Sequence, residues 1–171
     1  MKETIEEYKK RILGYQAGKD PLKLQAATPG KLDKLLKGVA RGKLTRRPAP
    51  GKWSVAEIIA HLADDELVGG YRVRKILEAP GTTIEAFDQD KWAEAGKYVK
   101  RNPKESLELF RALRNANLAL LRSLDTSQWG LTGLHAERGA ESIERYAQMY
   151  AGHDINHLQQ IEVILGKTGR R

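Results

Sequence analysis

Residues 53–66 read WSVAEIIAHLADDE, and this stretch contains the clearest helix start in the chain. Ser54 is a residue type that caps helices, and Glu57, three positions later, can reach back to the backbone amide of Ser54, as in a capping box. Trp53 and Ile58 occupy the two positions of a hydrophobic staple around this cap. Two independent local features, the capping box and the hydrophobic staple, therefore predict a helix that begins directly after Ser54.

Outward from this stretch, apolar residues recur with helical spacing over most of the chain, and no window shows the apolar–polar alternation of a strand. The expected helices run from Ile5 to before Gly18, from Thr28–Pro29 to near Gly42, from Val55 to about Glu78, from Asn102–Pro103 to near Asp125, and from about Glu141 to Leu165. Residues 80–102 are less regular, with Trp92 and Tyr98 as expected anchors. The sequence predicts an all-α protein, and four long helices with short extra ones favour a four-helix bundle.

The chain has 171 residues, no cysteine and a formal net charge of +8. We expect one domain over residues 1–171, with residues 1–27 as an N-terminal helical extension, because a chain of this length can bury a full core. The lack of cysteine excludes thiolate zinc sites, iron–sulfur clusters and a cysteine nucleophile. The N-terminus is charged and no apolar run approaches the roughly 20 residues of a membrane span, so we expect a cytoplasmic protein with no membrane partner.

The positive charge is concentrated in the first third of the chain. Residues 1–52 hold 14 Lys and Arg against 5 Asp and Glu, so the remaining residues are close to neutral. A basic segment can bind nucleic acid, but a solvated helix face gives the same count. Aromatic residues make up only 6% of the chain, which is too few for a base-stacking surface. We therefore do not expect nucleic acid as a partner.

Titratable residues interrupt the apolar faces of the predicted helices. His153 and His157 are one turn apart on the last helix and can aim two imidazoles at one point. His61, from a facing helix, would complete a three-histidine site, and such a site suits a divalent transition metal while leaving one coordination position open. The alternative is a set of partly exposed or singly hydrogen-bonded histidines without metal.

Two oppositely charged residues also fall within apolar stripes. Glu66 lies along the middle of the stripe that follows Val55, and Arg114 lies in the leucine-rich face of the next long helix. An unpaired buried charge is costly, so we predict that Glu66 and Arg114 form a buried ion pair.

These residues occur in segments that resemble the DinB-like superfamily, which includes YfiT-type metal-dependent hydrolases. The resemblance rests on WSVAEIIAHLADDE at residues 53–66, RVR at residues 72–74 and AGHDINHLQQI at residues 151–161. It implies a four-helix bundle with a long crossover connection and a divalent metal, such as zinc, nickel or iron, held by three histidines. Carried over by position, the ligands are His61, His153 and His157.

The resemblance also implies a function. Members of this superfamily are metal-dependent hydrolases or transferases that use an external low-molecular-weight thiol, and we expect one of these reactions on a small-molecule substrate. Asp65 or Asp154 is expected to orient an imidazole or act as a base, and His135 matches a loop near the site, where it would touch substrate; the alternative for His135 is an exposed loop histidine. The competing class is a non-enzymatic protein that binds metal or a small molecule, or that acts in stress responses. Nucleic-acid binding is a less favoured version of this alternative.

We expect the substrate to lie beneath the loops at residues 80–102 and 126–140, because these adjoin the ends of the helices that carry the histidines. Trp92, Trp129 and His135 in these loops are suited to line a pocket. A second copy of the chain is also a candidate partner, with which it would form a homodimer.

Overall fold

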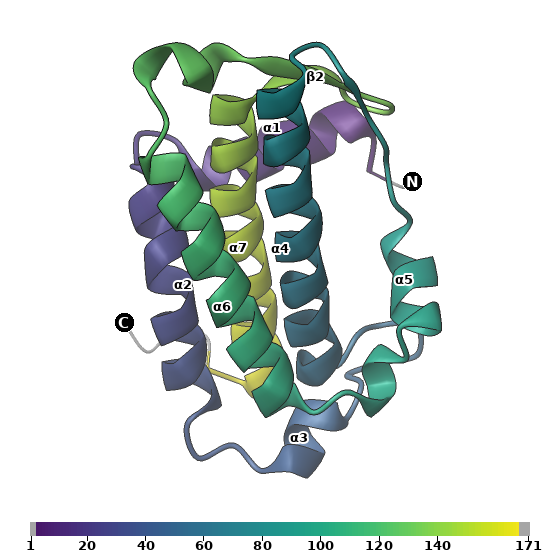
Figure 1. Ribbon diagram of the computed structural model, residues 1–171. Helices are drawn as coiled ribbons and strands as arrows, with labels where there is room; N and C mark the ends of the chain where they lie inside the picture. Colours follow the sequence, from purple (N-terminus) through teal and green to yellow (C-terminus); the bar gives the residue numbers. More distant parts are fainter. Residues whose placement is uncertain (1–2, 168–171) are drawn as a thin grey trace.

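Four long helices lie side by side in the computed structural model, which describes residues 3–167 (Figure 1). They are α2 (Pro21–Leu36), α4 (Val55–Glu78), α6 (Pro103–Arg122) and α7 (Ile143–Leu165). Figure 1 shows that α2 and α7 run in one direction and that α4 and α6 run in the other. The prediction of an all-α protein with a four-helix bundle is confirmed.

Because α4 and α6 are parallel, the chain between them has to return from one end of the bundle to the other. Residues 79–102 make this long crossover along the outside of the bundle (Figure 1). The crossover contains the short strand β1 (Thr83–Ile84), the helix α5 (Gln89–Ala95) and a 3₁₀ turn at Tyr98–Lys100. Tyr98 is fully buried and donates a hydrogen bond to Asp64 (2.7 Å), so it anchors the crossover as predicted. Trp92 is exposed and does not.

The helix starts follow their local sequence. At the start of α4, the Ser54 hydroxyl accepts a hydrogen bond from the amide of Glu57, whose carboxylate accepts one from the amide of Ser54 (2.8 Å). Asn102 caps α6 in a similar way, ahead of a proline at the first helical position. The last long helix ends at Gly166, whose left-handed conformation (φ +66°) glycine adopts without strain.

The predicted start of the second helix was wrong. It begins at Pro21 with Asp20 as its cap, and Thr28–Pro29 lies inside the helix instead of opening it. Both Asp20–Pro21 and Thr28–Pro29 have the form of a cap followed by a proline, so the local pattern alone does not separate them. The segment up to Gly42 is also divided, since a separate short helix, α3 (Arg41–Thr45), follows α2.

The expectation of no strands was wrong as well. Strand β2 (Thr132–His135) lies between β1, to which it is parallel, and β3 (Gly139–Ser142), to which it is antiparallel. This small sheet covers one end of the bundle, between the 3₁₀ segment η2 (Thr126–Gly130) and α7 (Figure 1). Strands of two to four residues are too short for periodicity to show, and they form because segments distant in sequence pair with one another.

The first helix, α1 (Ile5–Gln16), packs across α7. The contact is made at Gly152, where an added Cβ would lie 2.0 Å from the backbone oxygen of Ile12. A glycine is therefore required there for α1 to approach α7.

The core is divided along the bundle into two apolar clusters with a polar layer between them. One cluster includes Leu32, Ile58, Ile59, Phe110 and Ile161; the other includes Val73, Ile76, Ile84, Ile143 and Tyr146. Glu66 on α4, Arg114 on α6, and His153, Asp154 and His157 on α7 lie between these clusters in sequence, whereas His61 lies within the first cluster. No helix among residues 3–167 is long and apolar enough to cross a membrane.

Candidate metal centre

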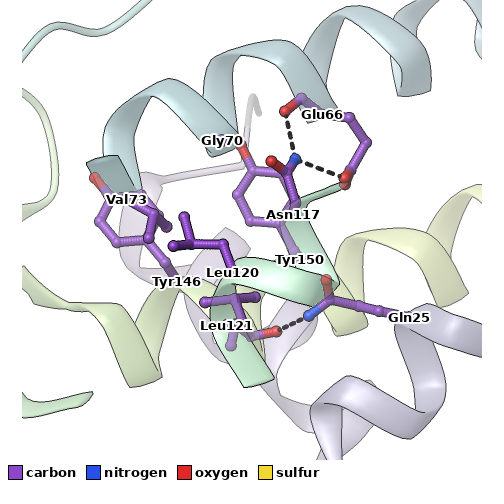
Figure 2. A pocket seen from close by; sticks show the side chains of 11 residues that line it. Gln25, Glu66, Gly70, Val73, Asn117, Leu120, Leu121, Tyr146 and Tyr150 are labelled. Carbon is purple, nitrogen blue, oxygen red and sulfur yellow. Dashed lines mark hydrogen bonds between the residues drawn. The ribbon is translucent and has the colours of Figure 1, made fainter. Parts of the chain in front are cut away.

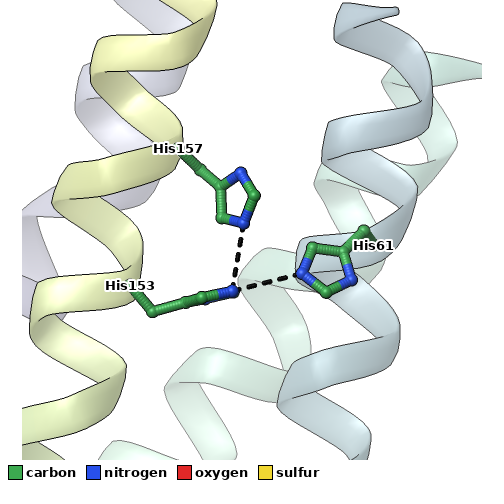
Figure 3. A group of neighbouring side chains, drawn as sticks. All are labelled: His61, His153 and His157. Carbon is green, nitrogen blue, oxygen red and sulfur yellow. Dashed lines mark hydrogen bonds between the residues drawn. The ribbon is translucent and has the colours of Figure 1, made fainter. Parts of the chain in front are cut away.

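Three histidines meet in the polar layer, one from α4 and two from α7 (Figure 3). The donor atoms of His61, His153 and His157 all lie within 4.8 Å of one another. Two features of the sequence bring them together: the four-residue spacing stacks His153 and His157 on one face of α7, and the packing of α4 against α7 presents His61 to that face. The predicted juxtaposition of these three residues is confirmed.

The spacing of the ring nitrogens fits a metal ion better than a hydrogen-bonded cluster. The Nε2 atom of His153 lies 3.2 Å from Nε2 of His61 and 3.0 Å from Nε2 of His157. One imidazole nitrogen has either a single N–H or a single lone pair in the ring plane, so it cannot form good hydrogen bonds to two other nitrogens. Nitrogens bound tetrahedrally to zinc at about 2.0–2.1 Å stand about 3.3 Å apart. The three imidazoles are thus placed as a divalent metal requires.

Side chains around the cluster orient two of the rings. Nδ1 of His157 is 2.9 Å from Oε1 of Gln160, an acceptor that places the ring proton on Nδ1 and leaves the Nε2 lone pair free. The carboxylate of Asp65 lies 3.5 Å from Nδ1 of His153, which agrees with its expected orienting role. Sequence reasoning missed Gln160, although its position one turn after His157 could have indicated it.

Burial keeps His61 and His157 uncharged. Desolvation, reinforced by the nearby His153, lowers the pKa of His61 to about 4 and lowers the pKa of His157 well below its usual value. Both rings are therefore neutral at pH 7, and neutral imidazole is the form that binds metal.

A pocket of about 390 Å³ opens onto the cluster. His61, His153 and Asp65 line it on the bundle side, and residues 86–90 of the crossover line it from outside. His135 also lines it and is buried, so the alternative of an exposed loop histidine was wrong. Both predicted loops contribute to this pocket.

The two loop tryptophans do not line this pocket, contrary to expectation. Trp92 lies against Phe87 on the outer surface, with ring centroids 4.9 Å apart. Trp129 packs against the apolar cluster that contains Ile143. Both tryptophan side chains therefore pack against apolar groups outside this pocket.

The family model described as the DinB superfamily matches residues 26–161. The chain belongs to this superfamily. It is 34% identical over 112 residues to a protein of Oceanobacillus iheyensis named "Putative metal-dependent hydrolase", an alignment that covers 65% of this chain and 64% of that protein. It is 25% identical over 167 residues to "Putative metal-dependent hydrolase YfiT" of Bacillus subtilis, covering 96% of this chain and 94% of YfiT.

A solved structure gives the same fold. YfiT from Bacillus subtilis, described as "a probable metal-dependent hydrolase with an unusual four-helix bundle topology", superposes with a TM-score of 0.80 at 22% sequence identity, covering 97% of this chain and 90% of YfiT. At this identity the likeness shows that the two proteins share a four-helix-bundle fold.

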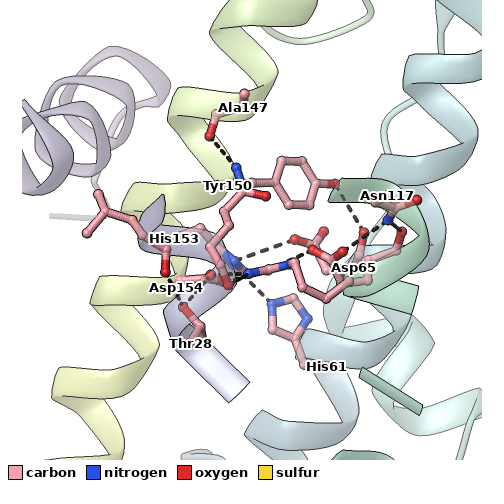
Figure 4. A network of polar contacts seen from close by, with 12 residues as sticks. Thr28, His61, Asp65, Asn117, Ala147, Tyr150, His153 and Asp154 are labelled. Atoms are coloured by element: carbon pink, nitrogen blue, oxygen red, sulfur yellow. Dashed lines mark hydrogen bonds and ion pairs between the residues drawn. The ribbon is translucent and has the colours of Figure 1, made fainter. Parts of the chain in front are cut away.

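In this DinB-superfamily chain, Asp154 is part of an ion-pair network and not of the histidine cluster (Figure 4). Its carboxylate accepts hydrogen bonds from Arg114 (2.9 Å) and Thr28 (2.8 Å). Among residues 3–167 it forms no hydrogen bond or ion pair with a histidine. The expectation that Asp154 orients an imidazole is therefore corrected: periodicity gives the direction of the side chain, but the neighbouring helices determine its partner.

The predicted ion pair between Glu66 and Arg114 is present and fully buried, with Nη2 2.8 Å from Oε1. Arg114 thus binds two carboxylates, and its Nη1 also donates to the backbone oxygen of Gln25 (2.8 Å). That oxygen would normally accept a bond from residue 29, but Pro29 has no N–H. The proline inside α2 therefore leaves free the carbonyl that Arg114 uses.

A smaller pocket of about 20 Å³ lies beside this network (Figure 2). Asn117 borders it and donates to the carboxylate (3.0 Å) and to the backbone oxygen (2.8 Å) of Glu66. Asn117 comes this close because α4 has Gly70 there, where a Cβ would lie 2.3 Å from Oδ1 of Asn117. The space suits about one water molecule, so it is not a substrate pocket.

Proposed function

We propose that this protein is a divalent-metal-dependent enzyme that acts on a small molecule bound in the 390 Å³ pocket. The proposal rests on the convergence of His61, His153 and His157, two of which, His61 and His153, line this pocket. The names of the relatives, which describe metal-dependent hydrolases, support the same class of chemistry.

The three histidines would hold the ion and leave one position open toward the pocket. A divalent cation with neutral ligands keeps its full charge and lowers the pKa of a water or thiol bound there. Gln160 fixes the ring of His157 for this task. Asp65 lines the pocket and lies close to His153, so it is the residue placed to hold that ring or to accept a proton from the incoming nucleophile.

The nucleophile comes from outside the chain. The sequence contains no cysteine, so a transferred thiol would have to be an external low-molecular-weight thiol. With water as nucleophile, its oxygen adds to the substrate carbonyl and its proton goes to the leaving group. Hydrolysis is our first candidate because of the relatives' names, and thiol transfer is the second because the open position accepts either donor.

The test is a paired panel of substrates with metal-loaded protein. One half contains esters and amides without thiol, and the other contains electrophiles with glutathione, bacillithiol or mycothiol. Turnover that needs no thiol selects a hydrolase, and turnover that needs a thiol selects a transferase; either activity should disappear in His61→Ala and persist in Arg74→Met, whose arginine lies outside the pocket. If neither half of the panel shows turnover although one metal ion is bound per chain, the enzyme proposal is rejected in favour of a binding role.

A further inference from the structure

Arg72 is a buried cation without an anionic partner in the part of the chain that the structure describes. It lies on α4, lines the 390 Å³ pocket and is only 5% exposed. Its Nη2 donates to the backbone oxygen of Glu85 (2.7 Å), and its guanidinium lies 5.6 Å from the centre of the Phe87 ring. Among residues 3–167 no carboxylate forms an ion pair with it. A buried charge left unpaired in this way is costly unless a ligand completes it.

His135 contributes an unused donor to the same pocket. Its ring is 3% exposed, and Nδ1 accepts a hydrogen bond from the backbone amide of Glu137 (3.2 Å). A nitrogen that accepts carries no proton, so the ring proton of His135 is on Nε2. That buried N–H has no acceptor among the described residues. Buried donors of this kind are rare in native proteins unless water or a ligand binds them.

Tyr146 contributes a second unused donor. It is 1% exposed, and its hydroxyl has no hydrogen-bond partner in the described part of the chain. Burial raises the pKa of Tyr146 to about 12, so the hydroxyl keeps its proton. Arg138 lies over the ring at 5.8 Å, but its charge is already matched by three hydrogen bonds to the buried carboxylate of Glu141.

The small sheet brings Arg72 and His135 to the same place. His135 is the pairing partner of Ile84 in the sheet, and Glu85, which holds Arg72, is the next residue after Ile84. Tyr146 lines the same pocket from the first turn of α7. We call Arg72, His135 and Tyr146 the donor cluster.

We propose that the donor cluster binds a carboxylate group of the substrate. This inference rests on the proposed function and assigns the substrate class of the same pocket: a small carboxylic acid whose reacting bond lies away from the carboxylate. Arg72 is 11 residues from His61 on α4, and Tyr146 is 7 residues from His153 on α7. At about 1.5 Å per residue, the donor cluster and the histidines are therefore offset by roughly 10–16 Å along the helices.

The charges favour a monoanion over a phosphate dianion. Arg72 is the one cation of the donor cluster, and the other two donors are neutral. Carboxylates also line the pocket and would repel a second negative charge; they belong to Asp65, Asp88, Asp90 and Glu137. A planar guanidinium with two neutral donors matches the oxygens of a single carboxylate.

The experiment titrates metal-loaded protein with straight-chain monocarboxylates of four to eight carbons and with the matching primary amides. Binding is followed by ¹H–¹⁵N spectra of the imidazole nitrogens, which are simple because the chain has four histidines. The Nε2–H signal of His135, assigned with His135→Gln, should shift with the acids, and at least one acid should bind about tenfold more tightly than its amide. Equal binding of acids and amides would overturn the inference.

Variants separate the donor cluster from the metal site. The preference for the acid should fall below about twofold in Arg72→Met, fall about fivefold in the isosteric Tyr146→Phe, and remain in Arg74→Met, a control on the same helix outside the pocket. It should also remain in His157→Ala, because the donor cluster does not need the metal. A preference for the acid that persists in Arg72→Met would overturn the inference. A preference that is lost only in His157→Ala would also overturn it, because the carboxylate would then bind at the histidines. A preference that persists in a protein without turnover would instead count against the proposed function alone.

Discussion

At the scale of single residues, Arg114 determines whether the polar layer can exist inside the bundle. It is 1% exposed and is the cation shared by Glu66 and Asp154. The carboxylates repel each other without it, and desolvation already raises the pKa of Glu66. The arginine therefore offsets one of the two negative charges that this buried layer would otherwise hold.

This role predicts a large loss of stability for Arg114→Met, about 3–5 kcal/mol, because both carboxylates lose their partner. Glu66→Gln should cost less, since the amide keeps a contact with Asn117. The matched control is Arg111→Met, which removes a half-exposed ion pair with Asp33 and should cost less than about 1 kcal/mol. Urea unfolding measures all three, and a double-mutant cycle without coupling between Glu66 and Arg114 would contradict the pairing.

A second prediction concerns His135, whose pKa is lowered to about 4 by desolvation and by the nearby Arg138 and Arg72. In the unfolded chain this histidine titrates near 6.5, so between pH 6.5 and about 4 the unfolded state binds more protons than the folded state. The stability of the metal-free protein should therefore fall, relative to His135→Gln, as the pH decreases through this window. Urea unfolding in the presence of a chelator at pH 7.5, 6 and 5 measures the difference, and parallel pH profiles for the two proteins would refute it.

At the scale of elements, Gly152 sets the position of α1 over the metal centre. Gly152→Ala would place a methyl group 2.0 Å from the backbone oxygen of Ile12, so α1 has to shift while the four-helix bundle stays folded. We expect faster hydrogen exchange in α1 and unchanged protection in α6. Gly14→Ala is the matched control in α1, because a Cβ there meets no atom within 4 Å; it should leave exchange slow and stabilise α1 by up to about 1 kcal/mol. Slow exchange of α1 in Gly152→Ala would contradict this account.

The sequence predicted an element well when the residues that determine it are close together in the chain. The starts of α4 and α6 were predicted because Ser54 and Asn102 bond to amides within three residues. The small sheet was missed because β1 pairs with β2 across the whole of α6, which short strands do not reveal. Asp154 was misplaced for a related reason: it shares a direction with the histidines on α7, but its partners Arg114 and Thr28 come from α6 and α2.

At the scale of the whole molecule, the bundle concentrates its buried polar and titratable side chains in one region. His153, His157 and the Arg114 network lie in sequence between the two apolar clusters, and His61 lies among residues of the first cluster, so packing at both ends fixes the positions of the polar side chains. The crossover and the small sheet then enclose the pocket from outside. Helical periodicity predicted that the three histidines point into the bundle, and the resemblance to the DinB-like superfamily assigned them to one site. The pocket walls come from irregular segments and were predicted only in outline.

We propose that His61, His153 and His157 together bind one divalent metal ion. Elemental analysis of tag-free protein, after metal supplementation and removal of excess ion, tests this directly. We predict about one transition-metal ion per chain in the wild type and in His135→Gln, the fourth histidine serving as control, and a loss of at least tenfold in metal affinity in His61→Ala, His153→Ala and His157→Ala. Wild-type protein without stoichiometric metal, or His157→Ala that binds metal as tightly as the wild type, would contradict the claim.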